Sequence, residues 1–152
     1  MVKQWRADNG LTLHPTKTRI VDSRTESFGY LGYEFLGVKR WPRKKSLQKL
    51  TETIRQKTKR TNGTTLSSVV TNLNRTLRGW FNYFQYSRYR TTFTVLDSWI
   101  RMRLRSILRR RYGLRGRGRG ADHHRWPNAC FTELGLFSLS TAHVAACQSS
   151  RR

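Results

Sequence analysis

The apolar side chains between residues 64 and 84 recur with the spacing of a helix that buries one wide face. They follow an i, i+3, i+4, i+7 rhythm, and Thr64, Thr65 and Ser67 are candidate N-caps behind an Asn62-Gly63 stop. The apolar positions are Leu66, Val69, Val70, Leu73, Leu77, Trp80, Phe81 and Phe84. The opposite face is polar and suits either plain solvation or contacts with phosphate and sugar; it carries Asn74, Arg75, Arg78 and Asn82.

Two more amphipathic helices are predicted, over residues 45–60 and 92–111. The first has Leu47, Leu50, Ile54 and Thr58 on one side and basic residues around the rest. The second has its apolar stripe at Phe93, Leu96, Ile100, Leu104, Ile107 and Leu108. Arginines flank that stripe on both sides. Three such helices with short loops predict a small bundle.

The segments on either side of these helices are less regular. Residues 17–21 read as a strand and residues 28–36 as a strand or tight hairpin, which must join a larger sheet or pack against the helices because so few strands are not stable alone. Trp41-Pro42 marks a boundary. After an arginine–glycine segment over 113–120, we expect a short helix from Ala129, a break at Gly135 and an apolar anchor ending at Leu139. The last residues of the chain, through Arg152, are expected to be frayed.

The predicted fold class is therefore mostly α (α+β): a small hairpin, a three-helix bundle and a short helical tail. The predicted divisions are residues 1–40, 41–112 and 113–152.

Composition narrows the class of partner. The chain has 152 residues, 36% of them hydrophobic, which is enough for a core. Its 31 Lys and Arg against 8 Asp and Glu give a formal charge of +23, which favours a polyanion such as nucleic acid. No long apolar run or signal-peptide core supports a membrane or secretion, so we expect a cytoplasmic protein with Cys130 and Cys147 as free thiols.

Catalytic and metal-binding patterns are weak in this chain. The acids Asp8, Asp22, Glu26, Glu34, Glu52, Asp97, Asp122 and Glu133 are scattered, whereas two-metal chemistry needs several converging carboxylates. His123 and His124 are adjacent and lack the spacing of a zinc site, so no metal site is predicted. Nothing marks a nucleophile elbow or a catalytic triad.

Arginines interleaved with aromatic residues are the stronger signal. Guanidinium groups bind phosphate through forked hydrogen bonds, and exposed rings stack on unpaired bases. Trp80 lies on an apolar face and reads as core, whereas Trp99 lies on the arginine side and is the better candidate for an exposed contact. The candidate RNA-binding residues are Lys45, Lys49, Lys57, Arg60, Arg75, Arg78, Trp99, Arg101, Arg103, Arg105, Arg109, Arg110 and Arg125.

Several motifs, in order, resemble the C-terminal part of bacterial group II intron reverse transcriptases/maturases. GLTLHPTKTRIVD resembles the palm segment that follows the catalytic aspartates, and FGYLGYEFLG resembles the primer-grip hairpin. LRGWFNYF and LDSWIRMRLR fall in stretches that resemble the maturase-specific thumb, domain X. DHHRWPNACFTELGLFSLSTAH resembles the tail of maturases that lack an endonuclease domain.

The resemblance implies binding to group II intron RNA to help it fold for splicing, with reverse transcription and Mg²⁺ in the intact family members. Lys17 matches the palm lysine near the incoming nucleotide. The primer-grip-like residues are Phe28, Gly29, Tyr30, Leu31 and Gly32. The thumb helices would hold intron RNA or an RNA/DNA duplex. The chain begins after the position of the family's Tyr-Ala-Asp-Asp motif, so no catalytic residue and no cofactor is predicted for it.

Three hypotheses follow from the sequence. The first is an RNA-binding maturase module without polymerase activity of its own. The second is one piece of a split or truncated reverse transcriptase that joins an upstream polypeptide. The third is a non-functional gene relic whose truncated sheet cannot cover its edge.

Overall fold

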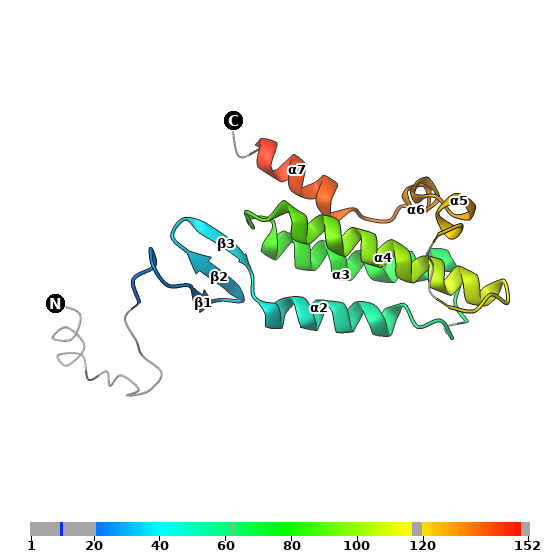
Figure 1. The fold of residues 1–152 in the computed structure, drawn as a ribbon, viewed down its shortest axis with the longest axis horizontal. Helices are drawn as coiled ribbons and strands as arrows, with labels where there is room; N and C mark the ends of the chain where they lie inside the picture. The colour runs from blue at the N-terminus through cyan, green and yellow to red at the C-terminus, as the bar shows by residue number, and fades with distance from the viewer. Residues whose placement is uncertain (1–9, 11–20, 62, 117–119, 150–152) are drawn as a thin grey trace.

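The computed structural model describes residues 10, 21–61, 63–116 and 120–149 of the chain (Figure 1). Its fold is mostly α, with one small antiparallel sheet, as the sequence predicts. The strands are β1 (Phe28–Tyr30), β2 (Tyr33–Leu36) and β3 (Lys39–Pro42). The helices are α2 (Lys44–Lys57), α3 (Leu66–Phe84), α4 (Arg90–Arg111), α5 (Asp122–Arg125), α6 (Asn128–Glu133) and α7 (Leu139–Ser149). The predicted strand over 17–21 lies almost wholly outside the described residues.

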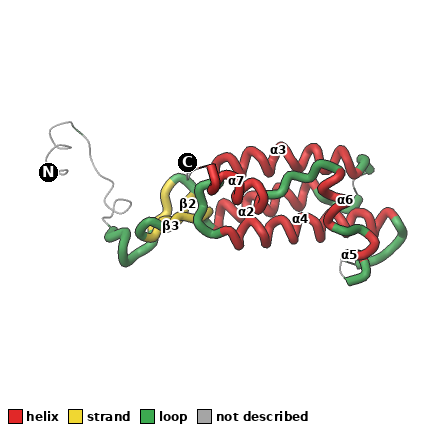
Figure 2. Tube along the Cα trace, turned by 90° about the horizontal axis from the view of Figure 1, so that it is seen from above, coloured by secondary structure: helices red, strands yellow, loops and turns green. Residues whose placement is uncertain are grey.

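Helices α2, α3 and α4 run side by side along the long axis of the molecule (Figures 1 and 2). Their bounds confirm the three predicted helices, with α2 ending three residues earlier than expected and α4 beginning two residues earlier. Thr65 is the N-cap of α3, and its hydroxyl accepts a hydrogen bond from the Ser68 amide at 3.2 Å. Thr58 closes α2, where its hydroxyl donates to the Ile54 carbonyl.

The apolar stripes of the three helices meet in one core. The periodicity located this core correctly: Ile54, Leu73, Leu77, Phe93 and Leu104 are fully buried, and Leu66, Trp80 and Leu108 are half-buried around it. The tail contributes to the same core through Trp126, Phe131 and Leu139. Burying this apolar area is the main favourable term in the stability of the bundle.

The three strands form an antiparallel meander in the order β1-β2-β3. The predicted hairpin corresponds to β1 and β2. The third strand, β3, was not predicted, and it extends the sheet beyond residue 40. Leu31 and Gly32 link β1 to β2 with φ of 45° and 80°, the pair of positive values that a type I′ hairpin turn needs. The Gly32 carbonyl accepts hydrogen bonds from the Arg43 amide and the Ser46 hydroxyl, which ties this turn to the start of α2.

The sheet packs against the helices rather than standing alone. Tyr33 lies against Phe84, with ring centroids 4.9 Å apart, and its hydroxyl donates to the Tyr83 carbonyl at 2.5 Å. In return, the Tyr83 hydroxyl donates to the Leu31 carbonyl at 2.6 Å. Burial raises the pKa of Tyr33 to about 12, with nearby Arg40 opposing the shift.

The tail folds back over the bundle, and helix α7, which was not predicted, continues to Ser149; residues 150–152, at the end of the segment expected to be frayed, lie outside the described residues. Helix α7 lies across α3 and α4 on the side away from α2 (Figures 1 and 2) and packs against α4. Its N-terminus is held by Asp97 of α4, which is 3% exposed and accepts hydrogen bonds from the Leu139 and Ser140 amides, each at 3.0 Å. The Ser138 and Ser140 hydroxyls also donate to Asp97. A carboxylate 42 positions earlier in the sequence thus satisfies the amides of a new helix.

Replacing Asp97 should release α7. Asp97→Asn removes the charge and one acceptor, leaving α7 amides unsatisfied, and we expect it to lower the free energy of unfolding by about 1–3 kcal/mol. Hydrogen exchange of residues 139–149 should rise more than that of α3. Glu52→Gln, at an exposed carboxylate of α2, is the matched control. Unchanged protection of α7 in Asp97→Asn would contradict the role given to Asp97.

Alkaline pH should unfold the sheet–bundle contact through Tyr33. Because its pKa is raised from 10.0 to about 12 in the folded state, the unfolded chain loses this proton first, and stability present below pH 10 falls as pH rises towards 12. We expect Tyr33→Phe to flatten this fall in denaturant titrations, while costing about 1 kcal/mol at neutral pH because one hydrogen bond is removed. Tyr30→Phe, at a tyrosine that is 61% exposed in the same hairpin, should follow the wild-type curve. Parallel curves for Tyr33→Phe and wild type would contradict the assignment.

Candidate nucleic-acid interface

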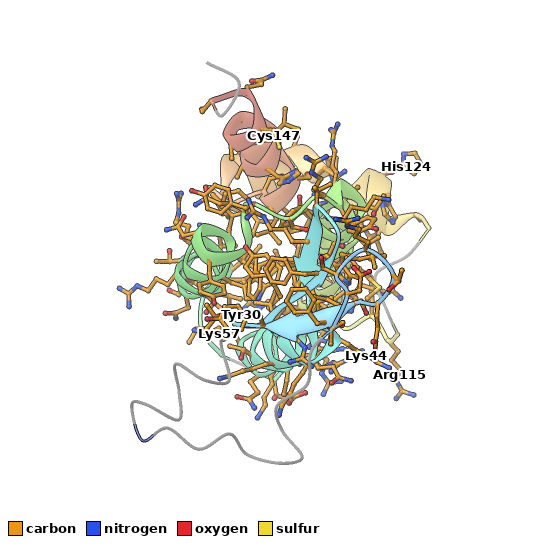
Figure 3. All side chains as sticks on the ribbon, turned by 90° about the vertical axis from the view of Figure 1, so that its left-hand side faces the viewer. Tyr30, Lys44, Lys57, Arg115, His124 and Cys147 are labelled. Atoms are coloured by element: carbon orange, nitrogen blue, oxygen red, sulfur yellow. The ribbon has the colours of Figure 1, made fainter. Side chains whose placement is uncertain are left out.

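Exposed basic side chains surround the three long helices. Figure 3 shows Lys44 and Lys57 on two sides of α2, and Arg115, which follows α4 in the chain, on the same side of the view as Lys44. Of the candidate RNA-binding residues, seven are exposed: Lys45, Lys49, Arg60, Arg75, Arg78, Arg110 and Arg125. They come from α2, α3, α4, α5 and the α2–α3 link, so the positive charge is spread over the bundle and is not confined to one helix.

Few of the exposed basic side chains have a carboxylate partner in the part of the chain that the structure describes. Among the described residues, ion pairs join Arg43 to Glu34 at 3.3 Å, Arg55 to Glu52 at 3.4 Å and Arg109 to Asp122 at 2.8 Å. The remaining exposed cations repel one another, and a polyanion that neutralised them would relieve that repulsion. The described surface is therefore strongly positive and would attract a polyanion.

Trp99 sits at the seam between α2 and α4 and is half-buried, less open than predicted. Two guanidinium groups lie over its ring, that of Arg55 at 5.7 Å from the ring centroid and that of Arg103 at 5.4 Å. These cation–π contacts hold the tryptophan and both arginines together. The sequence pattern did not single out Arg55, because a basic residue on the outer side of α2 looks like any other solvated charge.

Arg103 caps the C-terminal end of α2. Its guanidinium donates to the Thr58 hydroxyl at 2.5 Å, the Thr58 carbonyl at 3.2 Å and the Arg55 carbonyl at 3.2 Å. A cation at this position also complements the negative end of the α2 dipole. Burial, followed by the nearby charges of Arg55 and Arg60, lowers the pKa of Arg103 below its usual value. Arg103 therefore positions α2 as well as adding to the surface charge.

Arg105 is not a surface residue, which corrects its prediction as an RNA contact. Its side chain is 2% exposed and donates to the Trp126 carbonyl at 2.9 Å and to the Asn128 side-chain oxygen at 2.7 Å. The guanidinium also lies 5.2 Å from the centroid of the Phe131 ring. Burial lowers the pKa of Arg105. The row Arg101, Arg105, Arg109 looked continuous in sequence, but the tail covers its centre.

The other arginines and lysines of this group are partly occupied. Arg109 donates to both carboxylate oxygens of Asp122, at 2.9 and 2.8 Å, and to the Arg115 carbonyl. Arg101 donates to the Ser98 hydroxyl at 3.3 Å, and Lys57 donates to the Asn72 carbonyl at 3.3 Å. All three are half-buried, so they offer fewer free donors than the exposed residues do.

The loops at the far end of the bundle are joined by arginines. Arg60 donates to the Gly116 carbonyl at 3.4 Å, and Arg111 donates to the Thr64 carbonyl. Arg111 and Arg115 are exposed there and add to the surface charge, although they were not among the candidates. The run of arginines from α4 into the arginine–glycine segment was the signal that could have identified them.

The primer-grip-like residues form β1 and its turn. Phe28 lies in β1 and stacks on Phe35, with ring centroids 5.4 Å apart, whereas Tyr30 and Leu31 are 61% and 65% exposed. Gly29 adjoins Arg43, whose guanidinium would lie 2.3 Å from an added Cβ. Lys17 lies outside the described residues.

Several of the acids that the structure describes have structural partners elsewhere in the fold. Besides Asp97 and Asp122, Glu34 and Glu52 each pair with an arginine. Within the described ranges, no three His, Cys, Asp or Glu side chains are grouped to hold a metal ion. His123 and His124 are exposed on α5, and Cys130 and Cys147 are free thiols.

A search for helices of membrane-spanning length and hydropathy found none in the described part of the chain.

Comparison with known protein families identifies the helical bundle. The family profile described as "Group II intron, maturase-specific domain" matches residues 47–126, which run from α2 through α3 and α4 to the end of α5. No curated protein matches the chain. The matched residues make up more than half of the sequence and contain most of the buried core. The chain belongs to the group II intron maturase-specific domain family.

Proposed function

We propose that this chain is an RNA-binding maturase module that helps a group II intron RNA to fold and splice, without polymerising nucleotides on its own. One observation carries the proposal. The helices that match the family profile present exposed Lys and Arg side chains that, among the described residues, have few carboxylate partners.

The physical basis of binding is counterion release. Each Lys or Arg that neutralises a phosphate frees condensed cations from the RNA, so affinity falls steeply as salt rises. Arginine adds forked hydrogen bonds to phosphate oxygens and can stack on bases. The Arg55–Trp99–Arg103 cluster at the α2–α4 seam would present both features at one place, with Arg55 exposed. A protein that holds distant RNA segments by their phosphates can stabilise the folded RNA without chemistry of its own.

A second candidate function is that of one piece of a reverse transcriptase that assembles with a separate polypeptide. It is favoured by β1, which lies at an edge of the sheet and pairs, among the described strands, with β2 alone. An unpaired edge with the exposed Tyr30 and Leu31 beside it could extend a larger sheet. An RNA/DNA duplex would then be a further ligand of the helices.

The proposal predicts strongly salt-dependent binding of a folded group II intron RNA. Six phosphate contacts would give a slope of log affinity against log salt of about −4 to −5. Lys45→Gln/Lys49→Gln and Arg75→Gln/Arg78→Gln should each reduce the magnitude of the slope by up to about 1.8, or roughly 0.7–0.9 for each phosphate that is no longer neutralised. Filter binding or fluorescence anisotropy over a salt series would measure this.

The control is Arg24→Gln/Lys39→Gln, which removes two exposed charges that lie outside helices α2, α3 and α4. Its slope should stay close to that of the wild type. Binding that is absent, or that does not respond to salt, would overturn the proposed function. Equal effects of all three double variants would mean that only total charge matters.

For the second candidate, primer extension should be assayed with this chain mixed with an upstream polypeptide that carries fingers and palm. Activity that appears only in the mixture would favour assembly. An inactive mixture, in a case where the chain alone still binds RNA, would leave the maturase module as the function.

A further inference from the structure

A cavity lies where the sheet, the α3–α4 link and α7 meet. Its volume is about 400 Å³, within the roughly 300–1,000 Å³ of small-ligand sites. The lining residues come from three separate parts of the chain: Arg40 from β3, residues 85–88 from the α3–α4 link, and His143, Ala146 and Cys147 from α7. Figure 3 places Cys147 at the opposite side of the molecule from Lys44 and Lys57 of α2. The cavity is thus distinct from the basic surface of α2.

The cavity is lined by cations and by no acids. Arg40 and Arg88 are both exposed, and no Asp or Glu is among the lining residues. Arg40 is fixed in place, because its Nε donates to the Tyr86 carbonyl at 2.9 Å. Its two terminal nitrogens, and the whole guanidinium of Arg88, make no hydrogen bond with any residue that the structure describes. These donors are available to an anion, and guanidinium groups bind phosphate through forked hydrogen bonds.

Tyr86 adds an aromatic surface beside these cations. Its ring is 56% exposed, and the Arg40 guanidinium lies 5.1 Å from the ring centroid. The link that carries Tyr86 is held at two points: the Ser87 amide donates to the Phe84 carbonyl at 3.0 Å, and the Arg88 amide donates to the Arg40 carbonyl at 2.9 Å. A ring held this way loses little entropy when a flat base stacks on it.

His143 fixes the inner side of the cavity. It is 5% exposed, and its Nε2 lies 2.7 Å from the Ser87 carbonyl, to which it donates. The imidazole also packs against Phe93, with ring centroids 4.6 Å apart. This contact joins α7 to the α3–α4 link and so holds two walls of the cavity together.

From these features we infer that the cavity receives one unpaired nucleotide of the bound RNA. Arg40 and Arg88 hold the phosphate, and the base stacks on Tyr86. The inference rests on the proposed RNA binding and adds a selectivity to it, because a base inside a duplex stack is not free to enter a cavity. The module would then favour RNA with an unpaired or extruded nucleotide over a continuous duplex.

Photo-crosslinking tests the location directly. The probe is a single-stranded oligoribonucleotide that contains thiouridine, compared with the same strand annealed to its complement. We expect crosslinks to the peptide that contains Tyr86 from the single strand and much weaker ones from the duplex. Crosslinks confined to α2 and α3, or equal crosslinks from the duplex, would overturn the inference.

Matched charge variants test the energetics. Arg40→Gln/Arg88→Gln should reduce the magnitude of the salt slope for the single strand by about 1.4, because two arginines no longer neutralise phosphate. Arg24→Gln/Lys39→Gln removes the same charge from exposed positions outside the cavity lining and outside α2, α3 and α4, and should leave the slope unchanged. Tyr86→Ala should weaken binding at least about 5-fold, because the base has no ring to stack on. Arg40 also supports the α3–α4 link, so the double variant could unfold. In that event the single variant Arg88→Gln is the test, and an unchanged salt slope for Arg88→Gln would overturn the inference.

Two further measurements separate the sources of failure. Titration with AMP, followed by NMR of the protein, shows whether a free mononucleotide binds as well as RNA; equal affinity would overturn RNA as the source of the ligand. Normal salt-dependent binding of intron RNA with unaffected cavity variants would reject the cavity site and leave the proposed function standing. Loss of all RNA binding in the wild type would reject the proposed function itself.

Discussion

Helix α4 holds this molecule together through hydrogen bonds between its polar side chains and the main chain of other elements. Asp97 binds the amides that begin α7, Arg103 binds carbonyls at the end of α2, and Arg105 binds the carbonyl of Trp126. Each bond satisfies a main-chain group that would otherwise be costly to bury. The apolar stripe of α4 supplies the core, but these polar contacts decide where α2 and the tail lie upon it.

This arrangement divides the arginines into two kinds. Some, such as Arg105 and Arg109, are used inside the molecule, where a guanidinium with several donors can satisfy more than one acceptor. Others, such as Arg75 and Arg110, remain exposed and give the surface its charge. A lysine could replace the second kind and keep the positive charge, although it would lose the forked hydrogen bonds to phosphate. It could not replace the first kind, because a single ammonium group does not reach the same set of acceptors.

The sequence predicted the bundle well because helix periodicity reports directly on burial. Leu73, Leu77 and Ile100 lie where their spacing placed them. Contacts between residues far apart in sequence could not be predicted in the same way. Nothing local distinguishes Arg105 from Arg101, and only the folded tail shows that one is covered. Helix α7 was missed for a related reason: its N-terminal acceptor is Asp97, a residue of another helix. The cavity is lined by residues of β3, the α3–α4 link and α7, so it could not be predicted from any single stretch of the sequence.

The tail also links the two candidate RNA-binding regions physically. Arg105 and Arg109 hold the segment around α5 and α6 against α4, and Asp97 then starts α7. Helix α7 in turn carries His143, which fixes the α3–α4 link on which Tyr86 stands. The geometry of the cavity thus depends on contacts that begin on α4, continue through α7 and end at the α3–α4 link. The other side of α4 faces α2. A change in how α4 holds the tail would reach the cavity without touching any residue that lines it, whereas the exposed charges of α2 would keep their positions.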